Sequence, residues 1–331
     1  MFFRLATTAA ALASMVTLAA AAEIKPAIVY DLGGKFDKSF NEGVYMGADK
    51  FKKDTNTDYR DFEPQNDSQR EQALRNFAKR GHSPIIAVGF SQAQAVEKVA
   101  AEFPDTHFAI IDMVVDKPNV ESIVFKEQEG SYLVGILAAL ASKSGKVGFV
   151  GGMDIPLIRR FACGYVGGVK SVKADAEVFQ NMTGTTGAAW TDPIKGGELA
   201  KSQFDRGADV VYHAAGGTGL GVLQAAADAG KLGIGVDSNQ NHIHPGKVLT
   251  SMLKRVDVAT YKVLETAKND QFKAGVQVMG LAEGGVGWAL DDNNRPLITP
   301  EMEAAVKKAE DDIKSGTVAV HDYMSDSACP Y

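Results

Sequence analysis

The feature that most constrains the fold of this chain is a regular alternation of short apolar segments with longer segments of helical periodicity. Eight segments have the length and composition of buried strands: Ala27–Tyr30, Ile85–Val88, His107–Ile111, Ser122–Phe125, Lys146–Val150, Ala176–Gln180, Val210–His213 and Leu232–Val236. Amphipathic segments follow most of them, for example Glu42–Thr55 and Gly130–Lys143. Because strands that alternate with helices pair in parallel, the pattern predicts an α/β fold with two doubly wound parallel sheets.

Length and composition are consistent with two domains. The chain has 331 residues, of which 45% are apolar and 23% charged, the balance of an ordinary globular protein. This length is too great for one small core, and we expect two similar lobes because the alternation runs through the chain twice. We assign residues 23–126 and 251–280 to the first lobe, and residues 127–250 and 281–331 to the second. A further strand, Lys247–Lys254, and a helix, Val256–Ala267, are expected to complete the first lobe, and Val276–Leu281 to return the chain to the second.

The N-terminus is typical of an export signal, which we predict over residues 1–22. Met1–Arg4 is a short basic segment, Leu5–Leu18 is apolar, and Ala20–Ala22 precedes the expected cleavage site before Glu23. The alternative is an uncleaved membrane anchor, but a spanning helix requires about 20 predominantly apolar residues. No cysteine follows the cleavage site. We therefore expect a soluble, exported protein without a lipid anchor.

Charge and cysteine content restrict the partners and the compartment. The net charge of −6 and the pI near 5.6 argue against a nucleic-acid partner, because phosphate contacts require a basic surface. The two cysteines are Cys163 and Cys329. An oxidising compartment would allow them to pair and so to tether the C-terminal tail. The alternative is two separate thiols, because the sequence does not give the distance between them.

The segment Asp31–Asn41, which follows the first predicted strand, has the composition of a ligand-binding loop. It contains two glycines, which let a backbone approach a ligand closely. Phe40 offers a stacking face, and Asp31 and Asn41 offer hydrogen-bonding groups. A loop in this position lies at the carboxyl edge of a parallel sheet, where ligands of open α/β folds bind.

Polar or aromatic residues also follow other predicted strands, and they are expected to meet the same cleft. These candidates are Phe90, Ser91, Asp112, Trp190, Gly216, Gly217, Asp237 and Lys254. Two aromatic faces suit a planar ring, and carboxylates accept hydrogen bonds from hydroxyl or amino groups. Each candidate also has a structural alternative. A strand-end Asp often caps the next helix, and Trp190 can simply belong to the core.

Five motifs resemble the basic membrane protein family of ABC-transporter substrate-binding proteins, and they occur in the family's order. They are Asp31–Asn41, Gly89-Phe90, Ala215–Gly219, Gly235–Gln240 and Thr250–Lys254. The resemblance implies a type I periplasmic-binding-protein fold, in which two Rossmann-like lobes are joined by a multi-strand hinge. The best-understood members are purine nucleoside receptors. The resemblance thus implies a periplasmic monomer that delivers a nucleoside to the transmembrane subunits of an ABC importer, with no cofactor, metal or catalytic step.

The same resemblance implies which residues would bind the base of the nucleoside. Phe40 would stack on it, and Trp190 falls where the family supplies the opposing aromatic ring, commonly a Phe. Asp31 and Asn41 would bond the edge of the base or its immediate surroundings.

For the ribose, the resemblance implies that Asp237 and Lys254 hold the hydroxyl groups, while Gly216 and Gly217 let backbone amides approach. Asp112 matches an acidic residue of the family in its strand-end position.

Other functions remain open from the residues alone. A sugar-binding protein of the same fold is the main alternative, and a secreted nucleoside hydrolase is another. Gly217–Gly221 departs from the dinucleotide-binding spacing. Ser91 follows a strand as a nucleophile would, but we expect it to form a hydrogen bond between the lobes or to cap a helix. His242 and His244 could bind a metal only with further ligands, and none has suitable spacing.

Overall fold

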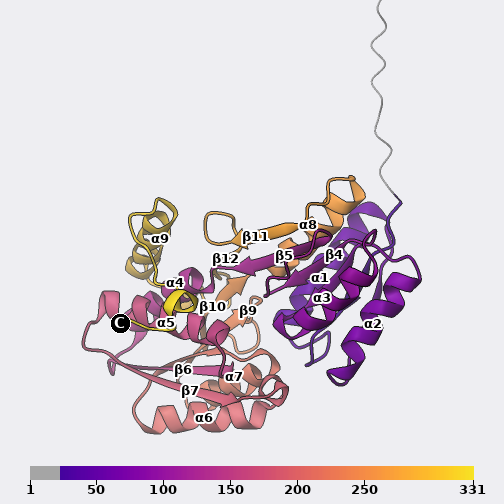
Figure 1. Ribbon diagram of the computed structural model, residues 1–331. Helices are drawn as coiled ribbons and strands as arrows, with labels where there is room; N and C mark the ends of the chain where they lie inside the picture. Colours follow the sequence, from indigo (N-terminus) through magenta and orange to yellow (C-terminus); the bar gives the residue numbers. More distant parts are fainter. Residues whose placement is uncertain (1–22) are drawn as a thin grey trace, which may run out of the picture.

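The computed structural model describes residues 23–331, so the predicted export signal lies outside the described residues. The chain forms two lobes, each built on a six-stranded sheet (Figure 1). The sheet of the first lobe has the order β11-β5-β4-β3-β1-β2, and all its strands are parallel. Its strands are β1 Ala27–Val29, β2 Arg60–Phe62, β3 Ile85–Val88, β4 Phe108–Ile111, β5 Val120–Phe125 and β11 Gly275–Met279.

Helices α1 (Phe40–Thr55), α2 (Ser68–Lys79), α3 (Ala93–Glu102) and α8 (Val256–Lys268) belong to the first lobe, with a short 3-10 turn, η1 (Phe90–Gln92), before α3. Helices α1 and α8 pack together. Their contact depends on a glycine. A Cβ atom at Gly47 would overlap the backbone carbonyl of Asp257 at the start of α8.

The sheet of the second lobe has the order β12-β10-β9-β8-β6-β7, with β12 antiparallel to β10 and the other pairs parallel. Its strands are β6 Lys146–Met153, β7 Glu177–Gly184, β8 Val210–Ala214, β9 Leu232–Asp237, β10 Val248–Lys254 and β12 Val286–Trp288. Its helices are α4 Glu127–Ala141, α5 Pro156–Val172, α6 Pro193–Asp205, α7 Gly219–Asp228, α9 Pro300–Lys314 and α10 Tyr323–Asp326, and the short 3-10 turns are η2 Gly187–Trp190, η3 Gly216–Thr218 and η4 Arg295–Leu297.

The chain passes between the lobes three times: between β5 and α4, between β10 and α8, and between β11 and β12. Three crossing segments of this kind form the multi-strand hinge, so the predicted α/β fold with two lobes is confirmed. The prediction that Lys247–Lys254 completes the first lobe is wrong. Strand β10 pairs with β9 and β12 in the second sheet, and the chain crosses only after Lys254. An apolar strand pattern shows that a segment is buried but not which sheet it joins.

Two strands and two helices were not predicted. Strand β2 is polar and partly exposed, and β12 is three residues long, so neither has the apolar alternation that identifies a strand. Helix α9 begins at a threonine cap, Thr299, whose hydroxyl accepts the backbone N–H of Met302. The short α10 lies in the C-terminal segment.

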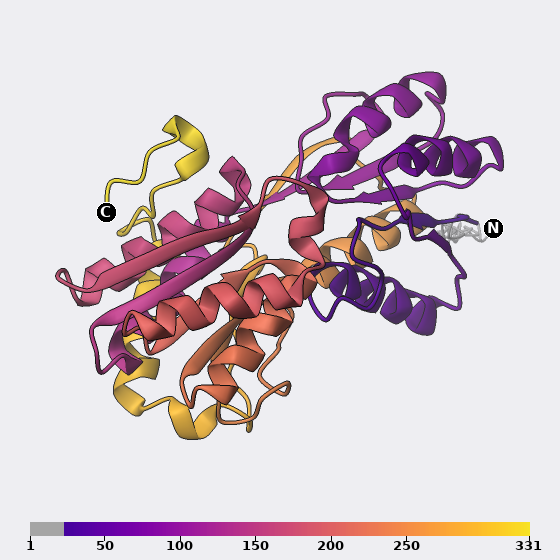
Figure 2. The same cartoon turned by 90° about the horizontal axis from the view of Figure 1, so that it is seen from below.

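The two cysteines are paired. A disulfide joins Cys163 on α5 to Cys329, with 5.6 Å between the Cα atoms, which decides between the two alternatives left by the sequence. The C-terminal segment therefore lies on the second lobe, beside α5 (Figure 2). Across residues 23–331, no helix combines the length and the apolar character that crossing a bilayer requires.

Candidate functional site

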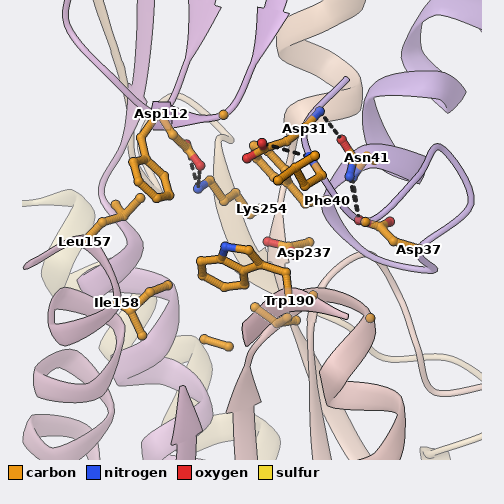
Figure 3. Close-up of a pocket in the computed structure, with 18 of the residues that line it drawn as sticks. Asp31, Asp37, Phe40, Asn41, Asp112, Leu157, Ile158, Trp190, Asp237 and Lys254 are labelled. Carbon is orange, nitrogen blue, oxygen red and sulfur yellow. Dashed lines mark hydrogen bonds and ion pairs between the residues drawn. The ribbon is translucent and has the colours of Figure 1, made fainter. Parts of the chain in front are cut away.

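The carboxyl ends of strands from both sheets face one cavity between the lobes (Figure 3). Such an edge is where ligands of open α/β folds bind. Ten of the eleven predicted site residues line it: Asp31, Phe40, Asn41, Phe90, Asp112, Trp190, Gly216, Gly217, Asp237 and Lys254. Ser91, the eleventh, lies directly behind Asp31. The strand-end argument thus brings residues from both lobes to one place, although contact with a ligand stays a prediction.

The loop before α1 is organised by a buried carboxylate, Asp37. Its oxygens accept the backbone N–H groups of Ser39 at 2.9 Å, Asn41 at 3.0 Å and Glu42 at 3.1 Å, which satisfies the free donors at the start of the helix. The Asn41 side chain donates to Asp37 at 3.1 Å and accepts the backbone N–H of Asp31 at 3.0 Å. Asn41 therefore braces the loop, and among residues 23–331 its side-chain nitrogen has one hydrogen-bond acceptor, Asp37.

Asp31 follows β1, and three hydrogen bonds reach the same oxygen of its carboxylate. Its Oδ1 accepts from Arg70 at 2.5 Å, from the backbone of Leu32 at 2.8 Å and from Ser91 at 3.0 Å. Burial raises the pKa of Asp31, and the charge of Arg70 opposes that rise. Ser91 and Asp31 both belong to the first lobe, so the expectation of a hydrogen bond between the lobes is wrong. The other oxygen, Oδ2, lies against Gly89, where a Cβ atom would overlap it.

Asp237 at the end of β9 connects the two lobes. The hydroxyl of Ser39 donates to its Oδ2, and two further hydrogen bonds join the same loops. Ser238 donates to the carbonyl of Ser39 at 2.9 Å, and Gln240 donates to the carbonyl of Lys38 at 2.9 Å. Burial raises the pKa of Asp237 to about 7, although the ammonium of Lys254 and the Ser39 hydroxyl favour its charged form.

Lys254, the last residue of β10, is the only cation among the lining residues of the cavity. Its Nζ lies 2.7 Å from Asp112 and 2.9 Å from Glu127. Burial lowers the pKa of Lys254, but the two carboxylates and Asp237 outweigh burial and raise it above its ordinary value. Burial likewise raises the pKa of Asp112 to about 6 against the attraction of Lys254. Lys254 Nζ also lies 5.2 Å from the ring centroid of Phe40, within cation–π range.

Asp112 and Asp237 share an uncommon backbone conformation. Their φ angles are 74° and 62°, in the left-handed region that Asp tolerates better than most residues. Both follow the last residue of a strand or end one, so this conformation turns the chain sharply at the edge of the sheet. Two carboxylates placed this way from different lobes are consistent with a ligand role, because such conformations concentrate at functional sites.

The aromatic walls come from opposite lobes. Phe40 is the first residue of α1 in the first lobe, and Trp190 ends the η2 turn in the second lobe. The indole packs on the backbone of Gly152 in β6, where a Cβ atom would lie only 2.7 Å from Cη2 and 2.5 Å from Cε3. Gly216 and Gly217 lie near the backbone carbonyl of the same tryptophan, whose oxygen would be 3.6 Å and 3.3 Å from a Cβ atom at these two positions. Figure 3 shows the indole beside Asp237 and Lys254.

Gly33 and Gly89, which belong to the predicted loop and motif, also line the cavity. Other lining residues were not identified from the sequence: Leu32, Asp37, Leu157, Ile158, Phe161, Ala214 and Val236. Leu157, Ile158 and Phe161 belong to the first turns of α5, which follow the strand predicted at Lys146–Val150. The same strand-end argument, applied after that strand, would have found them. Glu127 lies two residues after the predicted strand Ser122–Phe125, so the same argument would have found it as well. Arg70 had no such signal, because it reaches Asp31 from within α2 by its side chain alone.

The residues considered for catalysis or metal binding form hydrogen bonds to other groups. Ser91 donates to Asp31, while His213 lies fully buried on β8 with Nε2 2.9 Å from Gln240 Oε1, so they form no nucleophile–base pair. Burial lowers the pKa of His213 to about 4. The ring of His242 contacts the carbonyl of Asn239. Within residues 23–331, no group of three or more His, Cys, Asp or Glu side chains is placed to hold a metal ion.

Comparison with known proteins identifies the family. The sequence profile of the Bmp family, described as ABC transporter substrate-binding protein PnrA-like, matches residues 24–322. The chain belongs to this family. It is 34% identical to the ABC transporter nucleoside-binding protein BmpA of Lactococcus lactis, over 90% of this chain and 89% of the relative. It is 30% identical to Basic membrane protein A of Borreliella afzelii, over 89% and 91%.

The structure of this Bmp-family protein is also similar to solved structures of solute-binding proteins. An ABC transporter solute-binding protein from Aeropyrum pernix superposes with a TM-score of 0.83 at 29% identity, covering 90% of this chain and 93% of that one. The resemblance to the basic membrane protein family is thereby confirmed, and so is the periplasmic-binding-protein type of fold. The family consists of substrate-binding components of ABC transporters rather than of enzymes.

Proposed function

We propose that this Bmp-family protein captures a nucleoside, most favourably a purine nucleoside, in the cavity between its lobes and delivers it to an ABC permease. One observation carries the proposal. An aromatic ring from each lobe, Phe40 and Trp190, lines a cavity that also holds the Asp237 carboxylate and the Lys254 ammonium. This combination matches a ligand that has a flat apolar face at one end and hydroxyl groups at the other. The relative from Lactococcus lactis, named as nucleoside-binding, supports the same ligand class.

The energetics favour a base over a sugar as the anchoring group. Stacking of a base on an aromatic side chain contributes about 1–3 kcal/mol, and two rings are available. Asp237 Oδ2 is bonded to Ser39, so Oδ1 is the oxygen that remains to accept a ribose hydroxyl. A hydrogen bond to a charged carboxylate is stronger than one between neutral groups. Asp31 Oδ2 and the side-chain N–H of Asn41 are the groups that would bond the edge of the base.

The charges of the cavity disfavour a phosphorylated ligand. The lining includes the carboxylates of Asp31, Asp37, Asp112 and Asp237, and a single cation, Lys254, which already has two carboxylate partners. A phosphate would therefore add negative charge to a buried lining whose one cation is already paired. A neutral nucleoside brings only donors and a polarisable ring, which this site can satisfy.

Delivery follows from the hinge. We expect the three crossing segments to let the lobes close over a ligand. The closed protein would then diffuse as a monomer to the permease, which would bind this closed form. We infer export to the periplasm or the cell surface, because ABC importers receive their ligands outside the cytoplasm. Three relatives from Pyrococcus species are named lipoproteins, which conflicts with our expectation of an unanchored protein. The only cysteines of this sequence, Cys163 and Cys329, are joined in the disulfide.

Calorimetric titration is the direct test. The protein is unfolded, dialysed to remove carried-over ligand, refolded oxidatively and titrated with inosine, guanosine, adenosine, uridine, inosine monophosphate, hypoxanthine and ribose. We expect the purine nucleosides to bind tightly and the monophosphate to bind weakly. Tight binding of sugars without binding of nucleosides would refute the proposal, as would release of free base from inosine, which would indicate a hydrolase.

A variant separates stacking from folding. Phe40→Ala should lose most of the affinity while its thermal unfolding stays close to that of the parent, because Phe40 is only partly buried. A suitable control is Phe36→Ala, since Phe36 lies in the same loop with 62% of its surface exposed and does not line the cavity. Equal affinity of Phe40→Ala and the parent would exclude the stacking role.

A further inference from the structure

The C-terminal segment reaches the ligand site through an alternating row of charges. Starting from the cavity, Asp112 contacts Lys254, Lys254 contacts Glu127, Glu127 contacts Arg160, and Arg160 contacts Asp322. The Arg160–Glu127 distance is 3.0 Å, and the guanidinium makes a bidentate pair with Asp322 at 2.8 and 2.9 Å. The five groups come from five different segments of the chain, so the row joins the cavity, the hinge and the C-terminal segment.

The middle of this row is buried. Glu127 is fully buried, and its two oxygens are divided between Lys254 and Arg160. It is the first residue of α4, where the helix dipole also favours a carboxylate. Arg160 additionally donates to the carbonyl of Phe125 at 2.8 Å, at the first crossing between the lobes. The position of the Lys254 ammonium thus depends on Glu127, and that of Glu127 on Arg160.

The segment His321–Tyr331 is fastened along α5 at three points on one face of the helix. Asp322 pairs with Arg160, Cys329 is bonded to Cys163, and the Tyr331 ring covers Gly167, where a Cβ atom would lie 2.8 Å from Cζ. The spacing of 160, 163 and 167 places these three residues on one side of a helix. The cavity-lining residues of the same helix, such as Phe161, lie next to this attachment.

We propose that the segment His321–Tyr331 is a positioning element of the ligand site. By holding Arg160, it keeps one oxygen of Glu127 on Arg160 and the other on Lys254, and so fixes the ammonium of Lys254 in the cavity. The proposal rests on the role given to Lys254 in the proposed function. Without the Asp322 charge, the Arg160 guanidinium retains one anionic partner, Glu127, and competes with Lys254 for its oxygens. Lys254 then shifts toward Asp112, away from the position that suits a ligand hydroxyl.

The test compares Asp322→Asn and Cys329→Ala with a matched control on the same helix. Asp154→Asn is that control, because Asp154 forms an equally close bidentate pair with Arg159, the neighbour of Arg160, outside the row and outside the cavity. Calorimetry should show about 2- to 30-fold weaker binding of inosine for the first two variants, the range expected for coupling through packed side chains. Asp154→Asn should bind as the parent does, and Asp322→Glu should restore most of the affinity.

A second ligand distinguishes positioning from general softening of the fold. The loss should fall on the ribose hydroxyls, so 2′,3′-dideoxyinosine should bind Asp322→Asn as well as it binds the parent. An equal loss for both ligands, or no loss for inosine, would overturn the proposal.

A third measurement does not use a nucleoside. Acylation of the ligand-free protein by an amine-reactive ester, followed by mass spectrometry of the peptide that contains Lys254, should proceed at least about threefold faster in Asp322→Asn and Cys329→Ala than in the parent and Asp154→Asn. Unchanged rates would overturn the positioning role. If the parent binds no nucleoside, the proposed function fails, and the acylation rates still decide whether the segment holds Lys254.

Discussion

Adding a single methyl group behind Trp190 should displace the aromatic wall of the second lobe. Gly152 lies in β6 under the indole, and a Cβ atom there would be 2.5 Å from Cε3 and 2.7 Å from Cη2 of Trp190. Cζ3 would be closer still, and carbon atoms in contact prefer about 3.5–4.0 Å, so the ring must move by about 1.5 Å. Because the indole borders the cavity, the ring has space to move in that direction.

The consequence for binding follows from the value of stacking. A base stacked on an aromatic ring gains about 1–3 kcal/mol, and a ring displaced into the cavity both loses this gain and occupies space that the base requires. Gly152→Ala should therefore raise the Kd for inosine by about 5- to 150-fold. The cost in folding stability should be about 1–3 kcal/mol or less, as for other overpacked sites, since the cavity gives the ring somewhere to go.

Calorimetry and thermal unfolding of three variants test this reasoning. Gly287→Ala in β12 is the control, because a Cβ atom there meets nothing within 4 Å. The overlapping atoms of Trp190 belong to the benzo ring, so Trp190→Phe should relieve the overlap and recover part of the affinity in the double variant with Gly152→Ala. If Gly152→Ala binds inosine as the parent does, or loses as much affinity in the Trp190→Phe background, Trp190 is not a ligand wall.

Three further outcomes are expected. Burial raises the pKa of Asp237 to about 7, so the affinity for the nucleoside should rise between pH 6 and 8 as this carboxyl becomes charged. In the ligand-free protein, the contribution of this carboxyl to folding stability is present below pH 4 and is lost as the pH rises through 7. Asp237→Asn should flatten the first pH profile in calorimetry and the second in urea titration. Asp37→Ala removes the acceptor of three backbone N–H groups, so thermal unfolding should show about 1–3 kcal/mol of destabilisation, and a melting temperature equal to the parent's would contradict the capping role. Lys254→Met leaves Asp112 buried without its cation and Glu127 with Arg160 alone, so urea titration should show a loss of about 3–5 kcal/mol, and a neutral result would mean that water reaches this cluster.

Local patterns were enough to predict the two-lobed α/β fold and most of the cavity wall. Asp31, Asp112 and Asp237 all follow or end apolar strands, and parallel strands direct their carboxyl ends to the same edge. The lobe of β10 was predicted wrongly although β10 pairs with the strand that directly precedes it, β9, because an apolar pattern does not record which sheet a strand joins. Arg70 was missed for a different reason, since it lies on a helix 39 residues from its partner Asp31. Such pairs depend on tertiary packing, which no local spacing records.

We expect Asp237 to link closure of the lobes to binding of the ligand. Among residues 23–331, Ser39 is the only hydrogen-bond donor to its carboxylate, and Ser39 belongs to the other lobe. When the lobes separate, this donor is withdrawn and the carboxylate regains water; when they close, burial favours protonation unless donors replace the water. Ser39 replaces part of it, and a ribose hydroxyl on the second oxygen would replace more. Within the closed conformation, we therefore expect the charged form of Asp237 to be more stable with the ligand bound than without it, so that a ligand hydroxyl offsets part of the cost of burying this carboxylate when the lobes close.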